Sequence, residues 1–140
     1  MVDKITTVCM QQFPAHSGDC SGFVQAVGAG LGVTIQGQAN QIVDTLRAGG
    51  NWVPLADGPT ALASARAGKL VIAGLRGDEQ TAPDAHGHVV VVVDGPLANG
   101  VYPSAYWGQL HGTGAECKTI NWAWTKDDRD RVTYAAHDVP

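Results

Sequence analysis

The chain has 140 residues, the length of one domain, and with 44% apolar and 16% charged residues it is not a disordered polypeptide. Thirteen acidic side chains against nine basic ones give a net charge of −4. This balance argues against a nucleic-acid partner, because such binding requires clustered basic groups. No stretch of about 18 apolar residues is present, so no membrane span is expected. The first residues also lack the basic and apolar regions of a signal peptide.

Helical periodicity dominates the first half of the chain. Apolar residues at helical spacing predict a first helix that ends before Pro14, and Cys20 begins a second helix that stops at Gly32. A third helix is expected across Ala39–Ala48, and a fourth between Pro59 and Gly68. The inward-facing residues expected of the first two helices are Val2, Ile5, Cys9, Phe13, Phe23, Val24, Val27 and Leu31.

The second half of the chain reads as strands. The expected strands are residues 70–75, 88–93, 101–107 and 132–136, with a short helical turn from Thr125 to Asp128. Five consecutive valines after His88 indicate a central strand that is covered on both faces. Helices first and strands afterward predict a single α+β domain over residues 1–140, with the helices packed on one face of a mostly antiparallel sheet.

The segment Asp19-Cys20-Ser21-Gly22-Phe23 places a thiol at the start of a predicted helix. The N–H groups and the dipole of a helix N-terminus favour an anion, so the thiol pKa is expected to fall. The same N–H groups would stabilise an oxyanion formed when the sulfur attacks a carbonyl, and Gly22 would leave room for a substrate backbone. The competing interpretation is an inert cysteine of the core.

His88 opens the valine strand, where a rigid element would hold a general base in a fixed position. The competing interpretation is a hydrogen-bonded turn residue, which suits His86 better. A zinc site that uses His86, His88 and further His or Cys residues is a weaker alternative, since no usual ligand spacing is present, and no metal or other cofactor is expected. The charged run 127–131 is expected to be a solvated surface turn without catalytic meaning.

The Asp19–Phe23 segment followed by Gly87-His88-Val89-Val90-Val91-Val92 resembles the NlpC-type cell-wall peptidases, a papain-like superfamily. Further segments between residues 19 and 134 resemble one branch, the type VI secretion amidase effectors of family one. The quoted segments are Val71–Leu75, Gly95-Pro96-Leu97, Tyr102-Pro103, Trp107-Gly108 and Asp128-Arg129-Asp130-Arg131.

This resemblance implies an antibacterial toxin that the type VI apparatus of one Gram-negative cell delivers into the periplasm of another. Such an effector hydrolyses the peptidoglycan stem peptide between γ-D-glutamate and meso-diaminopimelate. A cognate immunity protein that plugs the active site protects the producing cell. Delivery by this route requires no signal peptide. A non-enzymatic wall-binding or protein-binding module on the same scaffold and a Cys–His acyltransferase remain the alternatives.

Carried over by position, the resemblance makes Cys20 the nucleophile and His88 the base, with Asp19 and Ser21 as substrate contacts. An N-terminal cap is an equally good role for Asp19. The superfamily orients its histidine with a polar third residue, which is missing here; the remaining candidates are Trp107 through its carbonyl, Gln109 and His111. With Cys20 required free, the resemblance also suggests a disulfide between Cys9 and Cys117.

Overall fold

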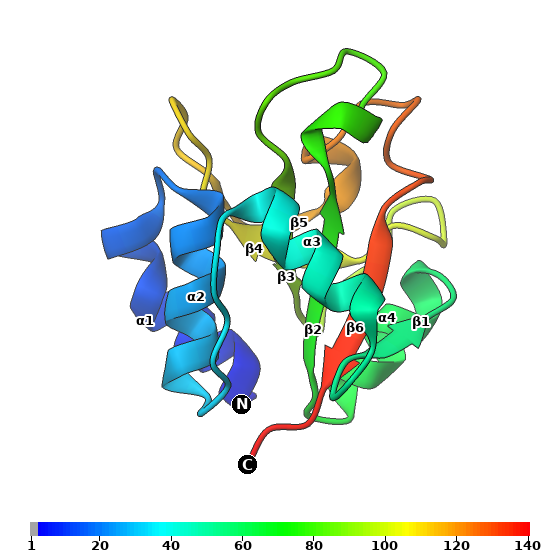
Figure 1. Cartoon of the computed structure of the whole chain (residues 1–140). Helices are drawn as coiled ribbons and strands as arrows, with labels where there is room; N and C mark the ends of the chain where they lie inside the picture. The colour runs from blue at the N-terminus through cyan, green and yellow to red at the C-terminus, as the bar shows by residue number, and fades with distance from the viewer. Residues whose placement is uncertain (1–2) are drawn as a thin grey trace.

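The computed structural model describes residues 3–140, and within them the chain forms an α+β fold (Figure 1). The helices are α1 (Lys4–His16), α2 (Cys20–Gly30), α3 (Ala39–Ala48) and α4 (Gly58–Arg66). The strands are β1 (Val53–Leu55), β2 (Leu70–Leu75), β3 (His88–Val92), β4 (Ser104–Trp107), β5 (Ala115–Thr119) and β6 (Thr133–His137). All pairings are antiparallel, in the order β1-β6-β2-β3-β4-β5, so the predicted fold class is confirmed.

The two central strands contribute to a separate core on each face of the sheet. Successive side chains of a strand point to opposite faces. Val89 and Val91 therefore pack with α1, α2 and α3, whereas Val90 and Val92 pack with Ala61 of α4 on the other face. Val89 through Val93 are all fully buried, which confirms a central strand covered on both sides.

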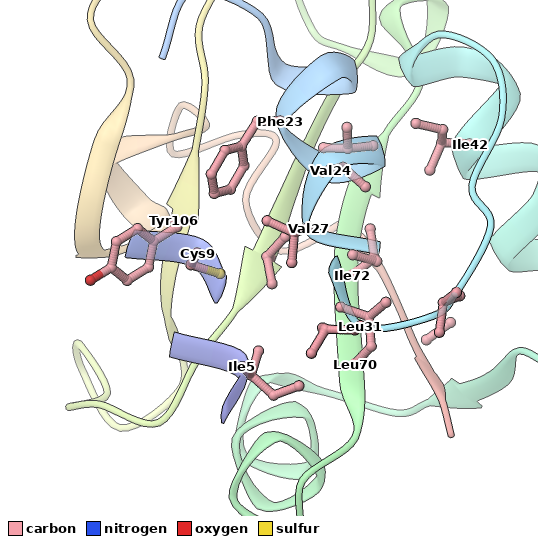
Figure 2. Packing of buried hydrophobic residues seen from close by; sticks show 14 of the residues in the cluster. Ile5, Cys9, Phe23, Val24, Val27, Leu31, Ile42, Leu70, Ile72 and Tyr106 are labelled. Carbon is pink, nitrogen blue, oxygen red and sulfur yellow. The ribbon is translucent and has the colours of Figure 1, made fainter. Parts of the chain in front are cut away.

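The first core lies between the sheet and the three N-terminal helices. Figure 2 shows side chains of α1, α2 and α3 gathered with Leu70 and Ile72 of β2, while Cys9 and Phe23 lie on the side of Tyr106 of β4. The expectation that all helices lie on one face is wrong for α4, whose Ala61 and Ala65 pack in the second core. Small residues on α4 let this short helix approach the opposite face of β2 and β6, which would otherwise expose apolar side chains.

Most predicted helix boundaries are confirmed, and the exception is α1. This helix continues through Pro14 to His16. Proline in the last turn removes one intrahelical hydrogen bond, and the buried side chains on the other turns still hold the helix together. Val2, expected on the buried face, lies outside the described residues, and Val8 takes part in the core instead. Gly32 ends α2 with a φ of 80°, a conformation that glycine adopts without strain.

The predicted strands are found, with two additions. The strand expected over 101–107 is shorter, since Tyr102 forms an isolated bridge with Ala98 and β4 begins at Ser104. The edge strands β1 and β5 were not predicted. The segment from Thr125 to Asp128 is a hydrogen-bonded turn without a helix.

The connections bring several element ends together. In Figure 1, the start of α2, the start of α3 and the loop before β3 lie at the upper end of the molecule. The two chain ends lie at the opposite, lower end in this view. The upper end is where the sequence-predicted site residues gather.

Candidate active site

A cleft of about 1000 Å³ lies at this end of the molecule, and Cys20 and His88 both line it. Its walls come from the start of α2, the first half of α3, the loop before β3 and the loop after β4. Cys20 and His88, 68 positions apart in the sequence, therefore face one cavity. A thiol and an imidazole in one cleft have the chemistry for nucleophilic attack on a carbonyl.

The turn that precedes Cys20 is held by the segment that follows β4. The N–H of Gln109 donates to the carbonyl of Ser17 at 2.9 Å. Gly108 packs so tightly here that a Cβ on it would lie 2.3 Å from the His16 oxygen and 2.5 Å from the Asp19 oxygen. This contact fixes where α2 begins and therefore where the Cys20 side chain is placed, a role of Gly108 that the sequence alone did not reveal.

The environment of Cys20 raises the pKa of its thiol, contrary to the expectation from the helix dipole. Burial is the largest cause, and the Asp19 carboxylate adds to it. Hydrogen bonding from the backbone of Val89, Ser21 and Cys20 itself lowers the pKa but does not compensate. Cys20 therefore carries a neutral thiol at pH 7 in the unliganded protein. The hydrogen bond from the Val89 backbone also places the Cys20 sulfur next to Val89, the residue that follows His88.

His88 is held between two indole rings. Its ring centroid lies 5.2 Å from that of Trp124 and 6.2 Å from that of Trp107, both in edge-on geometry. Both tryptophans are buried, and the surrounding protein lowers the pKa of His88 to about 4 by desolvation. The imidazole is therefore neutral at pH 7 and able to accept a proton.

The three candidates for a group that orients His88 differ in their position relative to its ring. Trp107 contacts the imidazole through its ring edge, and Gln109 and His111 line the cleft as exposed residues. Among the side-chain hydrogen bonds of residues 3–140, none involves the His88 ring. Aromatic packing is thus the side-chain contact that this structure provides for His88. The sequence did not indicate that Trp124 takes part in it.

Asp19 and Ser21 also line the cleft, where the Ser21 hydroxyl donates to the Asp19 carboxylate at 3.0 Å. The Asp19 side chain makes no capping hydrogen bond to α2, so the alternative role as a cap is not what the structure shows. The role expected of Gly22 is different as well. A Cβ there would lie 2.5 Å from the Asp19 carboxylate, so the missing side chain makes room for Asp19.

The charged run 127–131 is not a simple solvated turn. Asp128 is only 4% exposed, and its carboxylate accepts hydrogen bonds from the N–H and hydroxyl of Thr81 at 2.9 and 2.7 Å. Asp130 accepts from the hydroxyl of Tyr102 at 2.6 Å. Asp128 therefore anchors the loop that leads to His88, a structural role that the expectation of a surface turn missed.

All three cysteines are unbridged in the structure, with Cys9 buried, Cys20 half-buried and Cys117 exposed. The disulfide between Cys9 and Cys117 stays a prediction. Over residues 3–140, no three His, Cys, Asp or Glu side chains converge as metal ligands would, and no helix is long and apolar enough to cross a bilayer.

Comparison with known proteins finds one family for this chain through a sequence relative. No family model matches the chain. The chain is 40% identical over 128 residues to the peptidoglycan amidase Tse1 of Pseudomonas aeruginosa, a match that covers 89% of this chain and 78% of the relative. The chain belongs to the type VI secretion amidase effector family.

Proposed function

We propose that this protein is a peptidoglycan amidase effector in which Cys20 is the nucleophile and His88 the general base. The observation that supports the proposal is the shared cleft, which Cys20 at the start of α2 and His88 at the start of β3 both line. The relationship to a peptidoglycan amidase supports the substrate class. The cleft is open to solvent and large enough to admit a peptide.

The pKa directions define how the reaction starts. Both groups are neutral at pH 7, because burial raises the pKa of Cys20 and lowers that of His88. His88 takes the thiol proton as the sulfur attacks the amide carbonyl, and then gives this proton to the leaving amine. Water, deprotonated by His88, attacks the resulting thioester, which releases the acid and returns the proton to the thiolate.

The developing oxyanion has donors at the start of α2. The first N–H groups of a helix have no carbonyl partner within it, and Cys20 is the first residue of α2. Such donors stabilise the tetrahedral intermediate more than the planar amide, which is what accelerates the reaction.

The cleaved bond, the route of delivery and the inhibitor are proposed from the family resemblance. We propose cleavage between γ-D-glutamate and meso-diaminopimelate, delivery into the recipient periplasm by the type VI apparatus, and inhibition by an immunity protein that blocks the cleft. Asp19 and Ser21 form the cleft wall next to the nucleophile and would contact the polar stem peptide. A carboxylate at this place suits a substrate ammonium group.

Digestion of purified Gram-negative sacculi, followed by mass spectrometry of the released muropeptides, tests activity, bond and reaction type together. Cys20→Ala and His88→Ala are each expected to lower turnover by about three orders of magnitude or more. Cys117→Ser and His16→Ala serve as matched controls outside the cleft, with circular dichroism to verify folding.

Wild-type turnover in either cleft variant would remove that residue from the mechanism. Products joined to an added amine would identify an acyltransferase, and intact sacculi with retained binding would identify a non-enzymatic module. Release of stem fragments cut at another bond would overturn the proposed specificity alone.

A further inference from the structure

Asn40, in the first turn of α3, connects two loops next to the catalytic strand. Its side-chain oxygen accepts a hydrogen bond from the N–H of Gly77 at 2.9 Å. Its side-chain nitrogen donates to the carbonyl of Ala85 at 3.0 Å. One amide therefore satisfies a donor on the loop after β2 and an acceptor on the loop that leads into β3. An amide is suited to this task, because a carboxylate cannot donate and an ammonium cannot accept.

The two loops approach each other so closely that only glycine fits at the contact. A Cβ on Gly77 would lie 2.2 Å from the Asp84 oxygen and 2.6 Å from the His86 oxygen. A Cβ on Gly87 would lie 2.6 Å from the Asn40 side-chain oxygen and 2.7 Å from the Leu75 oxygen. The N–H of Asp84 also donates to the carbonyl of Gly77 at 3.0 Å. The path of the backbone into His88 is thus set by contacts with Asn40 and Gly77.

We infer that Asn40 is a positioning residue for the Cys20–His88 pair, because its amide holds Ala85, which only two residues separate from the start of β3. This inference rests on the proposed function. The segment from Thr81 to Gly87 has no regular secondary structure that would hold it by itself. The Asn40 amide lies at its His88 end and Asp128 at its Thr81 end. Loss of the Asn40 amide leaves the Asp128 contact in place but removes the hydrogen bond that holds the backbone next to His88.

The test compares Asn40→Ala and Asn40→Asp with the wild-type chain on a soluble stem-peptide substrate. Both variants are expected to lower kcat by about 10- to 100-fold with KM within about threefold, since a displacement of the base on the order of 1 Å is sufficient for such a loss. Asn51→Ala and Asn51→Asp are matched controls, because Asn51 is an exposed residue in a turn. They are expected to keep the wild-type kcat.

Two measurements on the same variants report position without relying on turnover. Amide hydrogen exchange at Gly77 is expected to accelerate in Asn40→Ala but to stay slow in Asn40→Asp, which keeps the acceptor. The NMR titration of His88 is expected to move from about 4 toward its ordinary range in both, as the ring gains solvent. If Asn40→Ala does not fold, the kcat and the titration of Asn40→Asp decide the question.

A raised KM with wild-type kcat would overturn the inference and make Asn40 a direct substrate contact. Wild-type kcat in Asn40→Asp, or a lowered kcat with the His88 titration unchanged, would also overturn it. Failure of the proposed function has a different signature: Cys20→Ala or His88→Ala would then retain activity. The three variants Cys20→Ala, His88→Ala and Asn40→Asp are therefore measured side by side.

Discussion

At the scale of single residues, the chemistry of this site depends on burial more than on charge pairs. Cys20 and His88 have neighbours that shift their pKa values in opposite directions, and desolvation is the largest cause for both. In the proposed mechanism, the neutral thiol of Cys20 must transfer a proton to the neutral imidazole of His88 before or during attack. A preformed thiolate–imidazolium pair would need no such transfer, so the dependence of the rate on pH distinguishes the two states.

The first prediction concerns that dependence. The acid limb of kcat/KM reports the pKa of the base in the free enzyme, which for His88 is about 4. We expect kcat/KM to be independent of pH between about 5 and 8 and to fall below this range as His88 becomes protonated. The pH dependence of kcat/KM is measured from the rates on a soluble stem peptide in buffers of constant ionic strength. An acid limb at the ordinary histidine pKa would contradict a base whose pKa is lowered by desolvation.

A second prediction concerns Asp128. Burial works to raise the pKa of its carboxyl, but hydrogen bonds from Thr81 and Arg131 outweigh this effect and hold the pKa below its usual range. Asp128→Ala leaves the Thr81 N–H without its acceptor, so the free energy of unfolding is expected to fall by about 1–3 kcal/mol. Urea unfolding measures the loss. Asp127→Ala, at an exposed neighbour, is the control and should change stability by about 0.5 kcal/mol at most.

At the scale of elements, the site depends on contacts between chain segments that are far apart in sequence. The turn before α2 is bound to the segment after β4, and α3 is bound to the loop before β3. These contacts use backbone atoms and glycines. They place the start of a helix and the start of a strand at the walls of one cleft.

The third prediction tests the first of these contacts. Gly108→Ala would place a Cβ within 2.5 Å of two backbone oxygens, which cannot move aside as a flexible side chain would. The turn before Cys20 must shift, so we expect a large loss of turnover together with a lower melting temperature. Gly18→Ala is the matched control in the same turn, because nothing lies within 4 Å of its added Cβ. Equal activity in the two variants would show that this contact does not set the position of Cys20.

Elements with strong local signals were predicted from the sequence, and those defined by distant contacts were not. The glycines after Ala48 and the valines after His88 mark their helix and strand locally, and both elements lie where expected. The edge strand β5 carries mostly exposed residues and has no apolar alternation to indicate it. Cys20 and His88 were proposed from the sequence because their types and settings are informative, and both line the cleft. Asn40, Trp124 and Asp128 were not, since their roles depend on partners that only the fold brings near.

At the scale of the whole molecule, half-buried His88 links the stability of the fold to pH. His88 has a lowered pKa when folded, so the unfolded chain binds a proton at higher pH than the native one. The stability associated with its neutral form is present above its unfolded pKa of about 6.5 and is lost as the pH falls toward about 4. The site therefore contributes to acid sensitivity of the whole domain.

The fourth prediction follows from this linkage. The free energy of unfolding should decrease between pH 6.5 and 4 by up to about 3 kcal/mol on account of His88. Urea unfolding at several pH values measures the slope. His88→Ala should flatten the slope whatever its effect on absolute stability, whereas His111→Ala, at an exposed position, should retain it. An unchanged slope in His88→Ala would assign the acid sensitivity to other groups.

The central sheet separates two cores, and the positions of the proposed nucleophile and base depend on both. Cys20 packs against the core beneath α1, α2 and α3, while the tryptophans around His88 belong to the core on the α4 side. A chain with only one of the two cores formed would lack the packing around Cys20 or the tryptophan packing around His88. Recovery of turnover during refolding should therefore coincide with the last layer to consolidate, which makes enzymatic assay a readout of full assembly.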